Sequence, residues 1–300
     1  MKIGFVSAIL DDWDFREVVD IAADMKYRCI ELACWPKEKA QRRYAGVSHL
    51  DVAELNDEKA GQFNMYLHSK EIELSSLAYY PNVMGGGSEC IAHLYQVMEA
   101  AKKMHVNLVS TFIGRVQDKT VEENLDLFER TWIPIVEKAE NLGIKIAIEN
   151  CPMLFGKEQW PGGQNLAYSP AIWREMFRRI PSSSLGLNYD PSHFVWQHMD
   201  YLKPVYEFKE RIFHVHCKDI KLYPEKLSDG GVLAYPLEYM SPKLPGLGDV
   251  DWRKFVSALT DIGYDGALCI EIEDKAFETS KDKKIESLRL SKRYIEQFII

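Results

Sequence analysis

Short apolar segments alternate with longer segments of helical periodicity along the whole chain. The short segments are six to nine residues long, rich in Val, Ile, Leu and aromatic residues, and bounded by turn residues. Segments of this kind are typical of buried β-strands. The predicted strands cover residues 2–7, 29–35, 72–80, 107–114, 144–150, 184–190, 211–219 and 266–274.

A helical pattern follows each of these strands. Asp12 or Asp14 can cap the first helix, the long fourth helix is expected to end at Asn141–Gly143, and Pro134 can kink that helix. The predicted helices cover residues 14–26, 52–70, 88–104, 120–142, 170–180, 199–210, 251–262 and 282–299.

Eight strands that alternate with helices predict parallel βαβ units and a closed (β/α)₈ TIM barrel, an α/β fold. We expect a single domain over residues 1–300, with long loops at the active-site end at about 151–169 and 220–250. The motif G-x-G-x-x-G does not follow an early strand, which disfavours an open dinucleotide-binding sheet.

The composition agrees with a globular protein, because 46% of the 300 residues are hydrophobic and 27% are charged. A net charge of −8 and the lack of a Lys/Arg run disfavour nucleic acid as a partner. The first residues lack the apolar core of a signal peptide, and no apolar window reaches membrane-spanning length. Six scattered cysteines without C-x-x-C spacing suggest reduced thiols, so we expect a cytoplasmic protein without membrane association.

Polar residues stand at the ends of four consecutive predicted strands. In a TIM barrel the carboxyl ends of the strands form the active site. Any one of these residues is more simply a helix cap, a surface charge or a satisfied core histidine. Together they are the following: Glu149 and Asn150 on the fifth strand, Asp190 and His193 after the sixth, His214, His216, Lys218 and Asp219 on the seventh, and Glu271 and Glu273 on the eighth.

Carboxylates on adjacent buried strands repel one another unless a cation neutralises them. A single divalent metal ion held by Glu149, Asp190, His216 and Glu271 would do so. Three carboxylates and one imidazole favour Mn²⁺ above all, then Mg²⁺, and are compatible with Co²⁺, Fe²⁺ or Zn²⁺. Because side chains alternate along a strand, His214 shares a face with His216 but lies one layer deeper, as support for the ligand or as core.

These residues resemble the xylose isomerase-like superfamily of sugar phosphate isomerases and epimerases. The phrases that carry the resemblance are "IAIENCP", "NYDPSH", "FHVHCKD", "PGLGDVDW" and "IEIED", between residues 145 and 274. Among its members, ketose epimerases of the D-tagatose 3-epimerase type are the best understood. The resemblance implies that the four residues named above bind the metal, and that Glu149 and Glu271 also act as the acid/base pair. It implies that His193 contacts the substrate.

Two positions depart from the epimerase pattern. Leu222 stands where those epimerases have an arginine that grips the sugar, and Phe155 stands where they have a glutamate. Lys218 is a candidate partial replacement for the arginine. A rim salt bridge is an equally good explanation of this lysine. The ketohexose substrate of those epimerases therefore does not transfer to this chain.

Further substrate contacts are expected from the rim. Aromatic side chains that can stack on a sugar are Trp35, Tyr79, Tyr80 and Trp160, although each is individually more typical of plain packing. Asn165 can reach the site from the loop after the fifth strand.

We expect a metal-dependent sugar isomerase or epimerase that moves a proton through an enediolate of a keto-sugar. The same chemistry permits a lyase or deglycosidase that cleaves a 3-keto-glycoside by β-elimination. A non-catalytic sugar-binding barrel is a third hypothesis, disfavoured because Glu149 and Glu271 are both present. An endonuclease IV-type DNA repair enzyme is disfavoured by the missing histidines on the early strands and by the acidic charge. The expected partner is a small sugar, and a homodimer or homotetramer is compatible with such a barrel.

Overall fold

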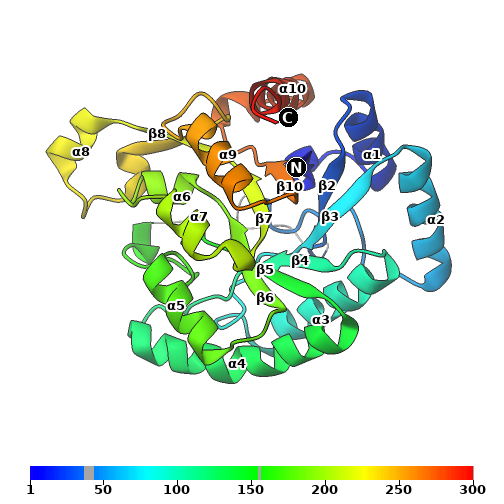
Figure 1. Ribbon diagram of the computed structural model, residues 1–300, viewed down its shortest axis with the longest axis horizontal. Helices are drawn as coiled ribbons and strands as arrows, with labels where there is room; N and C mark the ends of the chain where they lie inside the picture. Colours follow the sequence, from blue (N-terminus) through cyan, green and yellow to red (C-terminus); the bar gives the residue numbers. More distant parts are fainter. Residues whose placement is uncertain (37–43, 155–156, 300) are drawn as a thin grey trace.

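A computed structural model of the chain describes residues 1–36, 44–154 and 157–299. Eight parallel strands close into a barrel in the order β1-β10-β7-β6-β5-β4-β3-β2, and helices surround it (Figure 1). This arrangement confirms the predicted (β/α)₈ TIM barrel. The barrel strands are β1 (Lys2–Val6), β2 (Cys29–Ala33), β3 (Glu73–Ala78), β4 (Leu108–Thr111), β5 (Lys145–Glu149), β6 (Leu185–Tyr189), β7 (Ile212–Cys217) and β10 (Ala267–Ile270).

Each of the eight predicted strands contains one of these observed strands, one to five residues shorter than predicted. The outer helices also agree with the predictions, apart from the sixth, which was expected at 199–210. Within that range the chain forms only one short α-helix, Lys203–Glu207, with Pro204 in its first turn, and a second short helix, Ser192–Val195, precedes the predicted range. The helices are α1 (Phe15–Asp24), α2 (Asp57–Ser69), α3 (Gly87–Lys103), α4 (Val121–Leu142), α5 (Pro170–Arg179), α6 (Ser192–Val195), α7 (Lys203–Glu207), α9 (Trp252–Asp261) and α10 (Lys281–Glu296).

Local sequence explains where the helices begin and end. Asp14 accepts a hydrogen bond from the backbone of Glu17, whose side chain bonds back to Asp14, so the capping box fixes the start of α1. The long helix α4 ends at Gly143, whose φ of 72° is favourable for glycine alone. Both termini lie where the sequence predicts them, with Asp14 rather than Asp12 as the cap.

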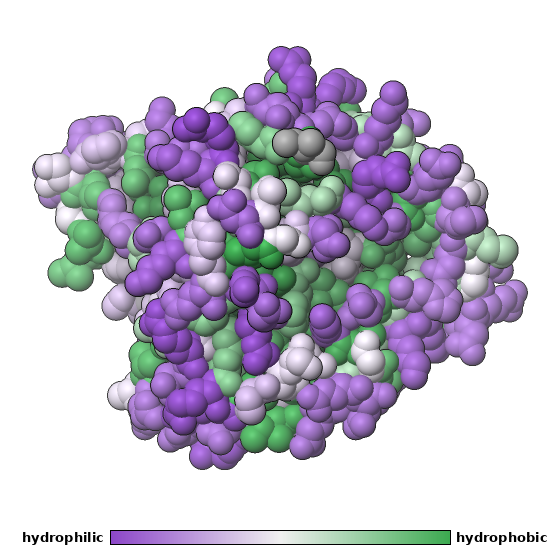
Figure 2. All heavy atoms as spheres, viewed as in Figure 1, coloured by the Kyte–Doolittle hydropathy of each residue, from purple (hydrophilic) through white to green (hydrophobic). Residues whose placement is uncertain are grey.

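The segment after β7 differs from the prediction. It was expected to be an irregular loop, but it contains an antiparallel pair of strands, β8 (Asp219–Leu222) and β9 (Met240–Lys243), joined through α8 (Pro224–Gly230). We call residues 219–243 the β8–β9 excursion. It projects from one side of the barrel in Figure 1, and hydrophobic residues show on its projecting end in Figure 2.

The barrel strands are largely buried. All five residues of β2 and of β6 are buried, as expected for strands covered on both faces. All six cysteines are unpaired, and Cys151 is half-buried at the end of β5. Within the described residues, no helix is both long and apolar enough to cross a membrane.

Candidate active site

The four predicted metal ligands stand at the carboxyl ends of neighbouring strands, and three of them, Glu149, His216 and Glu271, form one group of potential ligand atoms. Glu149 ends β5, Asp190 follows β6, His216 lies near the end of β7 and Glu271 follows β10. The Nδ1 atom of His216 lies 3.5 Å from Oε1 of Glu149 and 3.2 Å from Oε2 of Glu271. Glu149, Asp190 and His216 are buried, while Glu271 is partly exposed toward a cavity.

These side chains fit a divalent cation. Glu149 Oε1, Asp190 Oδ2 and His216 Nδ1 are buried and have no hydrogen-bond partner, which is costly unless another group satisfies them. Two ligand atoms, each about 2.1 Å from one cation, are roughly 3.0 to 3.4 Å apart in octahedral or tetrahedral geometry. Of the observed separations, 3.2 Å lies within that range and 3.5 Å just above it. Glu149, His216 and Glu271 therefore form a group that could hold a metal ion.

Lys218 brings a positive charge into the same cluster. Its Nζ lies 2.8 Å from Glu271 Oε2, 3.2 Å from Asp190 Oδ2, 3.5 Å from Glu273 Oε2 and 3.8 Å from Glu149 Oε1. Burial alone would lower the pKa of Lys218, but the surrounding carboxylates, Glu271 first, raise it well above its usual value. The lysine is therefore a buried ammonium group that contacts the acids themselves and not only the rim.

His193 lies between the acids and the outer part of the site. Its Nε2 is 3.2 Å from Asp190 Oδ2 and 3.6 Å from Glu149 Oε1, and it has no hydrogen-bond partner. The indole nitrogen of Trp196 lies 3.4 Å from Nδ1 of the same ring and donates to it. The imidazole is thus oriented by Trp196 on one side and directed at the metal cluster on the other.

The two predicted acid/base residues have different environments. Burial would raise the pKa of Glu149, but the charge of Lys218 and the nearby imidazoles of His193 and His216 hold it well below its usual range. Burial raises the pKa of Glu271, against the opposing charge of Lys218. Two carboxyl groups whose pKa values are moved in opposite directions are the usual arrangement for an acid/base pair.

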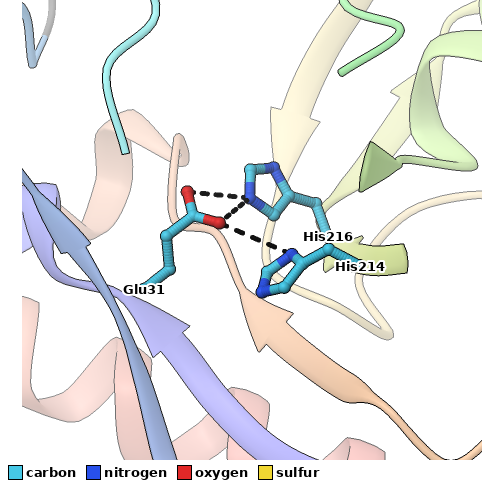
Figure 3. Close-up of side chains that lie close together, drawn as sticks. All are labelled: Glu31, His214 and His216. Atoms are coloured by element: carbon cyan, nitrogen blue, oxygen red, sulfur yellow. Dashed lines mark hydrogen bonds and ion pairs between the residues drawn. The ribbon is translucent and has the colours of Figure 1, made fainter. Parts of the chain in front are cut away.

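A buried glutamate that the sequence reading missed lies beside the two histidines of β7. Glu31, on β2, points across the barrel interior, and both of its oxygens lie 3.1 Å from His216 Nε2 (Figure 3). Oε2 also lies 3.5 Å from His214 Nδ1. Burial would raise the pKa of Glu31, but the charge and hydrogen bond of His216 outweigh it and lower the pKa to about 2. Glu31 is therefore an ionised acceptor.

Because a carboxylate only accepts hydrogen bonds, Nε2 of His216 carries a proton in this contact, which leaves Nδ1 as the nitrogen that faces Glu149 and Glu271. Burial alone would lower the pKa of His216, but the charges of Glu31 and Glu271 raise it well above its usual value. A metal ion at Nδ1 would take the place of a proton there. A carboxylate that orients a metal-binding imidazole in this way is a common arrangement. Glu31 is itself held by Tyr80, whose hydroxyl donates at 2.7 Å, and by Ser76, which donates at 3.0 Å.

His214 supports this network. Its Nδ1 lies 3.0 Å from Asn188 Oδ1 and its Nε2 lies 3.1 Å from Ser75 Oγ. Burial lowers the pKa of His214 to about 4, so the ring is neutral. The Asn188 amide also donates from Nδ2 to the hydroxyl of Tyr80 at 3.0 Å, and Tyr80 donates to Glu31 in turn. These contacts agree with the prediction that His214 lies below His216 and supports it.

The remaining candidates for substrate binding have different surroundings. Trp35 lines a cavity of ≈ 80 Å³ that also contacts Glu149, Lys218 and Glu271. Tyr79 is buried against Trp35, with ring centroids 4.9 Å apart, and does not line this cavity.

Asn165 differs more from the expectation. Its Nδ2 donates to the carbonyl oxygens of Glu149 and Cys151, and its Oδ1 accepts from Gly114 N, so the fully buried amide ties the loop to β5. Of the two positions that depart from the epimerase pattern, Leu222 lies on β8, and Phe155 lies outside the described residues.

Comparison with known proteins identifies the family. The profile of the family described as "Xylose isomerase-like TIM barrel" matches residues 19–294. The chain belongs to this family. The similar proteins named below differ in activity, so family membership alone does not give the reaction.

An inosose dehydratase of Lacticaseibacillus casei is 22% identical over 292 residues, covering 94% of this chain and 89% of that protein. A D-psicose 3-epimerase of Clostridium cellulolyticum H10, solved with D-tagatose, superposes with a TM-score of 0.72 at 13% identity, over 100% of this chain and 99% of the other. The IolI protein, solved with a zinc atom, superposes with a TM-score of 0.73 at 17% identity, over 100% and 98%. At these identities the two structures establish the fold.

Proposed function

We propose that this protein is a divalent-metal-dependent isomerase or epimerase of a keto-sugar, which transfers a proton through an enediolate. The observation that carries the proposal is the set of three buried ligand atoms on Glu149, Asp190 and His216 that take part in no hydrogen bond, with Glu271 beside them. The zinc-bound IolI neighbour supports a divalent metal ion, and the epimerase neighbour supports this chemistry on a barrel of this shape. Mn²⁺ remains our expected metal, since oxygen atoms dominate the ligands.

A divalent ion at these ligands supplies a Lewis acid that makes a C–H bond beside a carbonyl group acidic. Glu149, held ionised beside Lys218, is placed to accept that proton. Glu271 holds its proton more firmly and is placed to return one to the opposite face, for epimerisation, or to the neighbouring carbon, for isomerisation. His193, directed at the cluster from the outer side, is placed to contact the substrate oxygens.

A second candidate is a dehydratase or another lyase. Two observations favour it: a relative that covers most of this chain is an inosose dehydratase, and the buried ammonium of Lys218 adds a proton donor beside the acids. After proton removal by Glu149, the C–O bond at the next carbon would break. The departing oxygen would take a proton from Lys218 or His193 and leave as water or an alcohol.

Solvent isotope exchange tests the shared first step. Metal-stripped protein is reloaded with Mn²⁺ and incubated in D₂O with ketoses, keto-cyclitols and 3-keto-glycosides, and the loss of substrate proton signals is followed by NMR. Glu149→Gln and Glu271→Gln should each slow the productive reaction by about 100- to 10,000-fold, the usual contribution of general acid–base catalysis. Glu58→Gln, on the exposed face of α2, is the matched control and should leave the rate unchanged.

The products distinguish the two candidates. Epimerisation or isomerisation gives a product of unchanged mass apart from deuterium, while elimination gives an unsaturated product without the leaving group. If no substrate of the panel exchanges, or if exchange survives both glutamate substitutions, the proton-transfer function is wrong. Full activity in the stripped protein would contradict the metal centre.

A further inference from the structure

A second, larger cavity adjoins the metal side of the site. The cavity that contacts Glu149, Lys218 and Glu271 is ≈ 80 Å³, well below the roughly 300 to 1,000 Å³ of ordinary ligand pockets. The neighbouring cavity, which we call the outer chamber, is ≈ 420 Å³. Cys151, Met153 and Glu273 line both, so the two spaces meet at a common wall. A ligand held at the acids therefore extends toward the outer chamber.

The outer chamber is built from three loop segments at the carboxyl ends of the strands. The loop after β5 contributes Met153 and Leu154, the segment after β6 contributes His193 and Trp196, and the β8–β9 excursion contributes Ile220, Leu237 and Met240. Trp196, Ile220 and Met240 belong to one buried apolar cluster, against which Leu154 packs. The wall is thus a packed surface, not a chance gap between mobile side chains.

The chemistry of this wall disfavours a second sugar ring. Apolar side chains and prolines form most of it, and a sugar hydroxyl that leaves water for such a surface loses hydrogen bonds without replacement. Transfer of a flat apolar group from water to the same surface is favourable. The charged lining residues, Glu273, Lys275 and Glu278, all lie on the segment after β10, and two of the three are acidic. This excess of negative charge disfavours a phosphate group in the outer chamber.

We propose that the outer chamber binds an apolar, aromatic substituent of the substrate. The substrate is then a keto-sugar or keto-cyclitol that carries an aryl group, such as an aryl glycoside, with the reacting carbons at the acids and the aryl ring against Trp196, Ile220 and Met240. This inference rests on the proposed function for the placement of the sugar, and on the chamber itself for the aryl group.

Two unreactive probes that differ only in the substituent test the chamber. Phenyl β-D-glucopyranoside and methyl β-D-glucopyranoside are titrated into the metal-loaded protein by calorimetry. We expect the phenyl probe to bind at least about tenfold more tightly. Leu237→Asp places a carboxylate on the lining and should remove most of that difference. Leu237 is 46% exposed, so this substitution is compatible with folding, which thermal unfolding verifies.

Leu233→Asp is the matched control. Leu233 lies on the same excursion, is 84% exposed and does not line the chamber, so the preference for phenyl should persist in this variant. Equal affinities of the two probes, or the same loss in both variants, would overturn the inference. Isotope exchange with small ketoses, measured on the wild type, judges the proposed function separately. If isotope exchange fails but the phenyl probe still binds more tightly, the proposed proton transfer is wrong and the proposed role of the chamber stands.

Discussion

Replacement of Glu31 by glutamine should weaken metal binding although Glu31 is not a candidate ligand. Glutamine keeps the size of the side chain but removes its negative charge. The two 3.1 Å contacts that fix the Nε2 proton of His216 then lose their charged acceptor, so the Nδ1 atom is less firmly held toward the metal cluster. The hydroxyl groups of Tyr80 and Ser76 can rotate to suit the amide, so the fold should survive.

The size of the effect follows from the type of contact. Loss of a carboxylate that orients a metal-binding histidine typically lowers metal affinity by about 10- to 100-fold, or about 1.4 to 2.8 kcal/mol. A hydrogen bond to a charged group contributes about 1.5 to 3 kcal/mol, which agrees with that range. The full burial of Glu31 places the expectation near the upper end, because solvent cannot replace the lost charge.

Calorimetric titration of the metal-stripped variant with Mn²⁺ and with Zn²⁺ measures the effect. Ser76→Ala is the matched control: it removes one donor to Glu31, at 3.0 Å, without contacting His216, and should change the affinity by less than about threefold. Circular dichroism and thermal unfolding establish that both variants are folded. A folded Glu31→Gln variant that binds both metals within about threefold of the wild type would refute the orienting role of Glu31.

Three further predictions concern stability. Asp219→Asn should lower the free energy of unfolding in urea by about 2 to 4 kcal/mol, because Asp219 accepts from four N–H donors and an amide NH₂ must face two of them; an unchanged urea midpoint would contradict this. Burial lowers the pKa of His49 below the value of about 6.5 in the unfolded chain, so stability should fall as the pH drops below about 6.5, and less steeply in His49→Gln. Removal of the metal by a chelator should lower the free energy of unfolding by about 2.7 kcal/mol, relative to protein with the metal ion at 100 times its Kd. A Glu149→Gln variant that binds no metal should show no such loss.

The barrel, and the grouping of the candidate ligands at one end of it, were accessible from the sequence for a physical reason. Period and length distinguish buried strands from helices, and the carboxyl ends of consecutive parallel strands must meet at one end of the barrel. Glu149, Asp190, His216 and Glu271 could therefore be grouped without coordinates.

Glu31 could not be grouped in this way. Strand β2 does not pair with β7, so strand order does not place Glu31 beside His216. The Glu31 side chain reaches His216 across the barrel interior, and which side chains meet there depends on strand tilt and register. The available signal was one acid inside the apolar run "CIELACW".

The β8–β9 excursion was missed because its strands carry weak signals. Each has four residues, and β9 contains Pro242, which argues against a central strand but is acceptable in a two-stranded pair with free edges. Asn165 was assigned to the substrate because an amide in a loop is a common ligand contact. Its actual partners are backbone groups, which sequence does not reveal.

The position where the sequence departs from the ketose epimerases now has a structural context. Leu222 stands where those enzymes are expected to hold an arginine, and it packs against the apolar cluster of Trp196, Ile220 and Met240. Leu222 is partly buried, and a charged guanidinium at this place would lie against the same cluster, so leucine here suits the apolar wall of the outer chamber better than arginine. The acids that do chemistry stand on the barrel strands, while this wall stands on loops that can change without disturbing them. Under the proposal of an apolar outer chamber, the departure at position 222 corresponds to a change of substrate beside the proposed metal centre.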